Sequence, residues 1–588
     1  MSAPLQNTLV VLGCSATKFD VDGQVPAVHL YDGPMYRVLR SHLRSYRWPT
    51  DLSVSVLSAK YGLIGGLAPI ENYEQRMTPQ RALQLKEKVT SSLREISAKH
   101  KNLHMILGRD YLQAIDAPAL SNQISIDYAE GPIGMKLHRF SHLLSRHKRQ
   151  PRTHYSPELG PRPLYFLPDW DDFLDVDYDF DNDTFSAKAR AERNEVHMIK
   201  LFQPQRLCDG VLVSLAQHLG TKGLLRRVPL DDPYLLRPRS VRDHFGLSQD
   251  QWAFGDCGAF SYVNDDMPSI SVEQAVAIYE LYEFDMGASV DHIPVEEVTT
   301  IKGKRKLSDA ERRQRVKLTR ENAATFFSLW RSRQCNFTPV GVVQGLDPSS
   351  YARQVLEYAE IGYTHLALGG LVPRQDDDIK EIVNQVTRAL AQLKQRPWIH
   401  LLGIFRPKLQ EYFRHSRINS FDSATYFRKA WLRSDQNYLS GDGTWYAAVR
   451  VPPTSDPRTL LRLRTSGVRE STIKKREREV MRALFQYANR RMSRKRCLDA
   501  VMRYDELLDR AGPPPIDLKR QYDRTLKARP WEDCGCNVCQ SIGINALIFR
   551  GCNRNKRRGA HNTFRLYELL KNANAATALP IAEPSIRS

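Results

Sequence analysis

The chain has 588 residues, of which 41% are hydrophobic, so it is long enough for more than one domain with a sizeable core. No apolar run approaches the roughly 18 residues that span a bilayer, and the short apolar start has no Lys or Arg before it, which excludes a membrane span and a signal peptide. The formal net charge of +20 favours a polyanionic partner such as a nucleic acid.

Residues 1–147 alternate apolar strand patterns with helical patterns. The candidate strands are Thr8–Leu12, Leu52–Leu57 and Leu103–Leu107, and the candidate helices are Met35–Tyr46 and Pro79–Ala98. This alternation is typical of an open parallel sheet, so we predict a small α/β domain here. Residues 148–163 are rich in proline and in basic side chains and are interpreted as a linker.

An aspartate-rich stretch follows the linker. Asp175-x-Asp177-x-Asp179 resembles the start of a calcium-binding loop. That loop would need a glycine where Phe180 stands and a glutamate where Ser186 stands. We therefore interpret this stretch as an exposed turn region.

A second α/β series fills residues 164–530. Its candidate strands are seven short apolar runs: Gly210–Ser214, Ala253–Asp256, Gly287–Asp291, Pro339–Gln344, His365–Leu368, His400–Ile404 and Asn419–Asp422. Helical spacers separate these runs. The pattern predicts a (β/α)₈ TIM barrel with one further strand that periodicity does not reveal.

Candidate functional residues stand at or just after the carboxyl ends of five of these runs. They are Asp256, Asp291, Gln344, the pair Gly370-Leu371 after the fifth run, and Asp422. A lone aspartate after an apolar run is usually a helix N-cap. A (β/α)₈ barrel, however, places its active site at the carboxyl ends of its strands, so the whole set indicates a catalytic site.

A basic segment follows the barrel strands. Residues 462–496 contain 13 Lys or Arg and 3 Glu, a net charge of +10. A solvated helical face is the plain interpretation of such a run. The excess over compensating acids favours contact with phosphates.

Residues 531–573 hold a cysteine cluster followed by a histidine. Cys534, Cys536 and Cys539 form a C-x-C-x-x-C pattern, and His561 begins an amphipathic helical pattern. Three thiolates and one imidazole make a closed tetrahedral Zn²⁺ site, which is structural because no position is left for water. Cys552 is an alternative fourth ligand. A metal cluster among nine cysteines favours a reducing, cytoplasmic location, and residues 574–588 are predicted to be a disordered tail.

Across residues 160–575, the strand-end segments and the cysteine motif resemble the tRNA-guanine transglycosylase superfamily, in the same order. These enzymes exchange guanine for a 7-deazaguanine without cutting the nucleic-acid backbone. The resemblance implies that Asp422 is the nucleophile of a covalent aspartyl-glycosyl intermediate and that Asp256 is the general base. It also implies that Asp291, Gln344, Gly370 and Leu371 bind the base, and that Cys534, Cys536, Cys539 and His561 bind one zinc ion.

Three segments favour the DpdA-like branch, the DNA-guanine transglycosylases. They begin at Phe166 (FLPDWDD), Asp209 (DGVLVS) and Ser420 (SFDS). The resemblance then implies DNA as the partner, with a homodimer or accessory DNA-modification proteins as further partners and no membrane. The same chemistry on tRNA, a non-catalytic nucleic-acid-binding subunit and a glycosylase that only removes a base are the alternatives.

The residues after Gly370 bear on the side group of the incoming base. In bacterial tRNA enzymes the glycine-leucine pair leads to a glutamate that favours an aminomethyl cation. Here the run from Leu371 to Gln375 reads LVPRQ and has no carboxylate. The neutral nitrile of 7-cyano-7-deazaguanine (preQ0) is the expected side group.

The N-terminal domain resembles an uncharacterised domain family distantly similar to YaaA proteins. The segments that carry this resemblance contain Cys14, Lys18 and Lys60 at or near predicted strand ends. Strand ends at a topological switch point often bind nucleotides, so these residues are candidates for a nucleotide or base site. A DNA-binding or docking module with no such site is the alternative.

Overall fold

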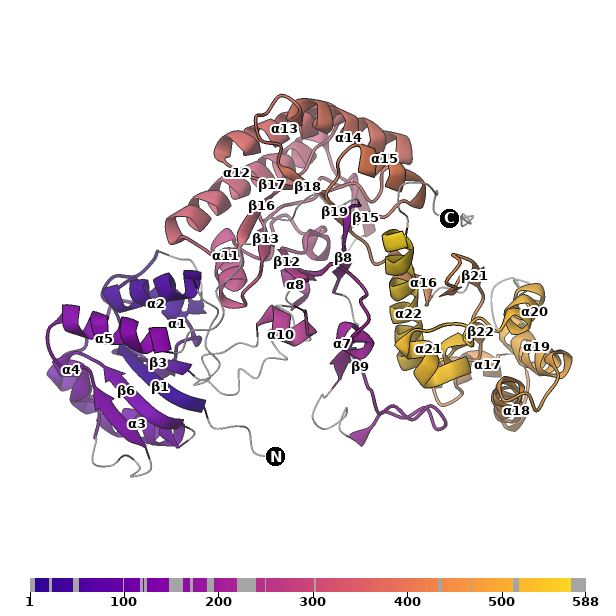
Figure 1. The fold of residues 1–588 in the computed structure, drawn as a ribbon, viewed down its shortest axis with the longest axis horizontal. Helices are drawn as coiled ribbons and strands as arrows, with labels where there is room; N and C mark the ends of the chain where they lie inside the picture. Colours follow the sequence, from indigo (N-terminus) through magenta and orange to yellow (C-terminus); the bar gives the residue numbers. More distant parts are fainter. Residues whose placement is uncertain are drawn as a thin grey trace.

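The computed structural model of the chain describes residues 6–20, 24–45, 52–98, 100–116, 120, 124–146, 162–169, 173–187, 195–218, 240–248, 250–300, 303–431, 436–465, 467–510 and 518–572. Most of the predicted linker and the whole predicted tail lie outside these residues. Figure 1 shows an N-terminal sheet domain, a central barrel and a C-terminal group of helices that follow one another along the molecule.

The N-terminal domain is a five-stranded sheet in the order β4-β3-β1-β6-β7. Its strands are β1 (Gln6–Gly13), β3 (Leu52–Ser58), β4 (Gly62–Gly65), β6 (His100–Ile106) and β7 (Ser125–Tyr128), and all are parallel to their neighbours except β4. Val10 and Leu12 join the core under helices α2 (Pro34–Ser45) and α5 (Ile133–Arg146), whereas Leu9 and Val11 join the core under α3 (Pro79–Ser97). Helices on both faces explain the continuous apolar run of β1 and confirm the predicted open sheet.

The second domain is a closed barrel of eight parallel strands. In barrel order they are β8 (Leu164–Pro168), β11 (Gly210–Ser214), β12 (Trp252–Asp256), β13 (Met286–Ala288), β16 (Thr338–Val343), β17 (His365–Leu368), β18 (Trp398–Leu401) and β19 (Ser420–Asp422). The predicted TIM barrel is confirmed. The strand that periodicity did not reveal is β8, which pairs with β11 on one side and β19 on the other.

Side chains alternate between the inside and the outside of the barrel. Phe166, Leu212 and Phe254 belong to a small cluster inside the barrel, whereas Val211 and Val213 pack outward against the helices. The covering helices include α11 (Val272–Leu281), α12 (Asp309–Arg333), α13 (Pro348–Ile361), α14 (Asp376–Leu390), α15 (Gln410–His415) and α16 (Thr425–Lys429). Capping boxes at the starts of α11, α12 and α13 fix where these helices begin and so where the strand-end loops stop.

The N-terminal domain packs against the barrel at the end of its covering helices. The guanidinium of Arg333, the last residue of α12, lies 5.2 Å from the ring centre of Phe19. The same contact region includes Val276 and Glu280 from the second half of α11. Helices of a (β/α)₈ barrel run antiparallel to the strands, so their carboxyl ends mark the amino ends of the strands. The N-terminal domain therefore sits at the end of the barrel opposite to the mouth where strand-end residues gather.

The C-terminal part consists mainly of helices beside the barrel (Figure 1). It contains α17 (Pro457–Arg464), α18 (Glu470–Ala488), α19 (Arg494–Arg510), α20 (Lys519–Ala528), α21 (Asn537–Ile542) and the long α22 (Gly551–Asn572). Helix α22 packs against α16 of the barrel and is almost entirely buried. No helix of the described residues has the length and apolar character needed to cross a membrane.

The aspartate-rich stretch forms turns with Asp177 and Asp181 exposed, as the sequence predicts, but Asp175 and Asp183 make contacts that the sequence does not show. Asp175 is 1% exposed and accepts hydrogen bonds from both the backbone and the hydroxyl of Ser186. Asp183 forms ion pairs with Arg550 and Arg554, which are buried. The carboxylates thus dock the loop onto α22, where buried guanidinium groups need opposite charges.

Candidate active site

A pocket of about 490 Å³ opens at the carboxyl ends of the barrel strands. Its lining includes five of the six residues that the sequence nominates for the reaction: Asp256, Asp291, Gln344, Gly370 and Asp422. Leu371 is fully buried behind Gly370 and is not part of the lining. Residues from separate strands and loops therefore converge on one cavity, as the strand-end pattern predicts.

Asp422 is the last residue of β19 and is 4% exposed. Its Oδ1 accepts a hydrogen bond from the backbone N–H of Gly403 at 2.7 Å and contacts Nε2 of His400 at 3.1 Å. Its Oδ2 receives no hydrogen bond from the residues that the structure describes. One oxygen of this carboxylate is thus held in place while the other is left for a bound molecule.

Asp256 is the last residue of β12 and is partly exposed to the pocket. The backbone N–H of Gly258 donates to its Oδ2 at 3.0 Å. Burial first, and then the negative charges of Asp291 and Asp422, raise the pKa of Asp256 to about 8. A carboxyl group with this pKa holds a proton at neutral pH and can give it to a reacting group.

Asp291 lies at the floor of a buried hydrogen-bond network. The thiol of Cys257 donates to its Oδ1 at 2.8 Å, and the amide Nε2 of Gln344 donates to its Oδ2 at 2.6 Å. The hydroxyl of Tyr262 contacts both the sulfur of Cys257 and the backbone oxygen of Asp291. Burial also raises the pKa of Asp291. Cys257 therefore supplies a hydrogen bond that helps to hold the side chain of Asp291 in place.

Gln344 has one polar atom left over. Its Oε1 is buried and has no hydrogen-bond partner among the described residues. The amide is oriented because its Nε2 donates to Asp291, so the oxygen is the free acceptor. A buried acceptor without a partner is costly, and its position in the lining indicates that a ligand donor satisfies it.

Two glycines make room for the Gln344 side chain. A Cβ atom on Gly369 would stand 2.2 Å from Nε2 of Gln344, and one on Gly370 would stand 2.7 Å from Oε1. Gly370 also has φ +68, a conformation that L side chains rarely adopt. The glycine pair is thus needed to place the amide, besides any close approach of a ligand to the backbone.

Three further residues at the pocket lie outside the set that the sequence nominated. Phe260 is 57% exposed at the rim, and Val372, which also lines the pocket, is 39% exposed. His400 lies beneath Asp422 inside the barrel. His400 falls in a predicted strand and Phe260 follows one, but alternation alone does not tell which side chains face a cavity.

The predicted metal residues form one buried group. The ligand atoms of Cys534, Cys536, Cys539 and His561 all lie within 4.8 Å of one another, so the group can hold a metal ion. Nε2 of His561 lies 2.7 Å from the backbone oxygen of Leu439. Cys552, the alternative ligand, is exposed and outside this group.

The strand-end residues of the N-terminal domain gather around Tyr73. The ammonium of Lys18 lies 4.8 Å and that of Lys60 lies 5.5 Å from the centre of its ring. The sulfur of Cys14 lies 3.1 Å from the hydroxyl of Tyr111. These groups occupy the carboxyl ends of β1 and β3, so the structure brings the three predicted residues to one edge of the sheet.

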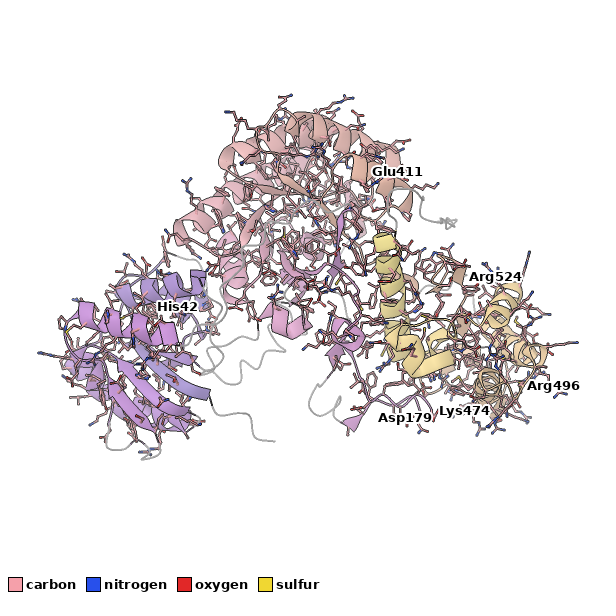
Figure 2. All side chains as sticks on the ribbon, viewed as in Figure 1. His42, Asp179, Glu411, Lys474, Arg496 and Arg524 are labelled. Atoms are coloured by element: carbon pink, nitrogen blue, oxygen red, sulfur yellow. The ribbon has the colours of Figure 1, made fainter. Side chains whose placement is uncertain are left out.

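The basic segment forms an outer surface of the C-terminal helices. Most of its Lys and Arg side chains are exposed, although Glu477 is buried against Arg550. Lys474, Arg496 and Arg524 extend from α18, α19 and α20 at the end of the molecule away from the N-terminal domain (Figure 2). The positive charge of the sequence is therefore concentrated on one solvent-facing region.

Comparisons with known proteins give one matching family model and one relative. A family model described as a family of unknown function (DUF6884) matches residues 9–142. The chain is 35% identical over 411 residues to a DNA-guanine transglycosylase of Salmonella montevideo, a match that covers 69% of this chain and 96% of the relative. The expected likeness of the N-terminal domain to YaaA proteins stays a prediction.

Proposed function

The chain belongs to the family of DNA-guanine transglycosylases, and from this premise we propose that it exchanges guanine for 7-cyano-7-deazaguanine in DNA. The observation that carries the proposal is that two carboxyl groups line one pocket. A hydrogen bond to Oδ1 holds the carboxylate of Asp422 in place, and Asp256 holds a proton at neutral pH. Cleavage and re-formation of a glycosidic bond need a nucleophile and an acid that later acts as a base.

The first half of the reaction removes guanine. Asp422 attacks the sugar carbon from the face opposite to the base and forms a covalent ester as the glycosidic bond breaks. Asp256 gives its proton to the departing base, which leaves as neutral guanine, and becomes a carboxylate. The raised pKa of Asp256 suits this order, because the group must be protonated when the DNA binds.

The second half inserts the new base. The carboxylate of Asp256 takes a ring proton from the incoming 7-deazaguanine, whose nitrogen attacks the sugar carbon and frees Asp422. Each group thereby returns to its starting state. Oε1 of Gln344 and the carboxyl of Asp291 line the pocket. There they can accept hydrogen bonds from the donor groups on the pyrimidine edge of a guanine-like base.

The base must leave the stack to reach this pocket. A nucleobase inside a duplex cannot contact groups at the bottom of a barrel mouth, so the nucleotide is flipped or single-stranded. Phe260 stands exposed at the rim and offers an aromatic face for stacking. The exposed basic helices, which include α18 and α19, supply phosphate contacts.

The proposal of a nitrile side group is based on the residues around Gly370. The run from Leu371 to Gln375 contains no carboxylate, and Val372 places apolar surface in the lining. Arg374 is directed away to the backbone oxygen of Gly345. Competition between the cyano and aminomethyl bases tests this point, and tighter binding of the aminomethyl cation would overturn it.

We also propose that the buried Cys₃His group binds one zinc ion. The Sγ atoms of Cys534, Cys536 and Cys539 lie 3.6, 3.3 and 3.4 Å from Nδ1 of His561. Tetrahedral zinc with ligands at about 2.3 Å for sulfur and about 2.0–2.1 Å for nitrogen separates them by about 3.6 Å. Because Nε2–H of His561 donates to Leu439, Nδ1 keeps the lone pair for the ion. Four protein ligands make the ion structural.

Nucleoside mass spectrometry tests the proposed activity. A host that makes 7-cyano-7-deazaguanine but lacks its own transglycosylase would express the wild type or Asp422→Ala. We expect the modified deoxynucleoside in DNA from the wild type and none from the variant. Asp347→Asn is the matched control, because Asp347 lies on the same barrel face, caps α13 and is outside the pocket lining, and asparagine also caps helices.

The other outcomes decide between the alternatives. Modification confined to tRNA would place the activity on tRNA, and abasic sites would indicate a glycosylase. No product in either nucleic acid would favour a non-catalytic subunit. We expect the protein to act in the cytoplasm, where thiolate ligands stay reduced.

A further inference from the structure

A chain of hydrogen bonds runs along the inside of the barrel to the carboxylate of Asp422. The indole Nε1–H of Trp398 donates to Oγ of Ser420 at 2.9 Å. The same Oγ lies 2.8 Å from Nδ1 of His400, and Nε2 of His400 lies 3.1 Å from Oδ1 of Asp422. Three neighbouring side chains on β18 and β19 thus connect a donor to the proposed nucleophile.

The direction of this chain is fixed by its last member. The carboxylate of Asp422 accepts at Oδ1, so the ring proton of His400 sits on Nε2 and points at it. In that tautomer Nδ1 accepts a hydrogen bond from the hydroxyl of Ser420. The oxygen of Ser420 in turn accepts from the indole of Trp398, which can only donate.

The surroundings of His400 fix its orientation. The side chain is fully buried, and the rings of Phe166 and Phe254 stand edge-on to it at 5.6 and 5.1 Å between centres. Ser420 and Asp422 contact its two ring nitrogens. The ring therefore cannot turn away from Asp422 without leaving a buried polar nitrogen unpaired.

We infer that His400 is a positioning residue that holds Asp422 for attack through a hydrogen bond from its Nε2–H. It acts with the backbone N–H of Gly403, which donates to the same Oδ1. Two donors on one oxygen fix the rotation of the carboxylate and leave Oδ2 as the attacking oxygen. This inference rests on the proposed function of Asp422 as the nucleophile. A misplacement of about 1 Å can cost about 10²-fold in rate, so the orientation matters to the reaction.

The tautomer is measured on the resting full-length protein with ¹⁵N-labelled histidine. Long-range ¹H–¹⁵N spectra distinguish a protonated Nε2 from a protonated Nδ1 and from the doubly protonated ring. We expect the Nε2–H pattern for the resonance that disappears in His400→Gln. In Ser420→Ala that pattern should weaken, because Nδ1 loses its donor. An Nε2 without a proton in the wild type would overturn the inference.

Kinetics test the positioning role. His400→Leu removes the donor, and His400→Gln places an amide N–H near the former Nε2. We expect the rate of adduct formation with DNA to fall about 10²-fold in His400→Leu, with KM nearly unchanged, and to recover partly in His400→Gln. His100→Gln is the matched control, because His100 is also a buried strand histidine bonded to a serine but lies in the N-terminal domain.

A failure of the positioning role of His400 and a failure of the proposed function give different results. If Asp422→Ala abolishes exchange while His400→Leu keeps the full rate with unchanged KM, the positioning role is wrong and the proposed function stands. If the wild type shows no exchange, the proposed function fails, and the ¹⁵N spectra still decide whether His400 donates to Asp422.

Discussion

Asp256→Asn should stabilise the folded protein at alkaline pH and leave its stability unchanged only below pH 3.8. The pocket raises the pKa of Asp256 from its ordinary value of 3.8 to about 8. Below both values the carboxyl is protonated in the folded and unfolded chains and resembles asparagine. Between them, the folded protein keeps a proton that the unfolded chain loses, so the wild type loses stability as pH rises.

The size of the effect follows from the same two values. One pKa unit corresponds to about 1.4 kcal/mol, so an increase from 3.8 to about 8 amounts to at most about 6 kcal/mol at pH 8 and above. Water in the open pocket lowers this figure, because Asp256 is partly exposed. Asp256→Asn is more stable than the wild type by this free energy, because it no longer buries a charge beside Asp291 and Asp422.

Thermal unfolding followed across pH 5 to 9 measures the difference. We expect the melting temperature of Asp256→Asn to exceed that of the wild type only slightly at pH 5 and by several degrees more at pH 8.5. Asp347→Asn is the control, because hydrogen bonds from Ser349 and Ser350 lower the pKa of Asp347, so its removal should not stabilise the protein at high pH. A constant difference between Asp256→Asn and wild type at all pH values would refute the reasoning.

Asp256 should also set the pH profile of the reaction. kcat/KM for DNA reports the free enzyme, in which Asp256 must hold its proton. We therefore expect kcat/KM to fall as pH rises through about 8. A profile that stays flat to pH 9.5 would show that another group protonates the leaving base.

Three other substitutions test the metal group and the base pocket. Cys536→Ser should lose bound zinc, measured by elemental analysis, and lower the melting temperature, whereas Cys552→Ser, outside the group, should retain one zinc per chain. Phe260→Ala should weaken DNA binding by about 1–3 kcal/mol in a titration with single-stranded DNA, with zinc content unchanged. Gly369→Ala should raise the KM for the incoming base at least tenfold, because the new Cβ displaces the Gln344 amide, and an unchanged KM would argue against Gln344 as a base contact.

The residues at the strand ends could be predicted to lie together, because a (β/α)₈ barrel brings the carboxyl ends of all its strands to one mouth. Asp256 and Asp422 each follow a recognisable apolar run, and parallel strands bring such ends to one mouth. Strand β8 could not be found in this way, because it is short, ends in Pro168 and lies next to an acidic stretch. A strand of this kind is defined by its neighbours β11 and β19 rather than by its own pattern.

The remaining misses involve contacts between distant segments. The sequence could not show that Asp183 meets Arg550 and Arg554, because the pairing depends on how α22 packs. His400 was visible within a predicted strand, but whether it faced the helices or the barrel interior depended on register. Charge and alternation indicate which segments form strands or exposed faces, whereas the tertiary fold decides the partner of a buried polar group.

The most direct test of a covalent exchange on Asp422 is to trap the intermediate. Purified protein is mixed with guanine-containing DNA, without added 7-deazaguanine, and denatured; the protein–DNA adduct is then digested and sequenced by mass spectrometry. The account predicts released guanine and a sugar ester on Asp422, absent in Asp422→Asn and chased away by 7-cyano-7-deazaguanine. An adduct on another residue, or base release without any adduct, would contradict it.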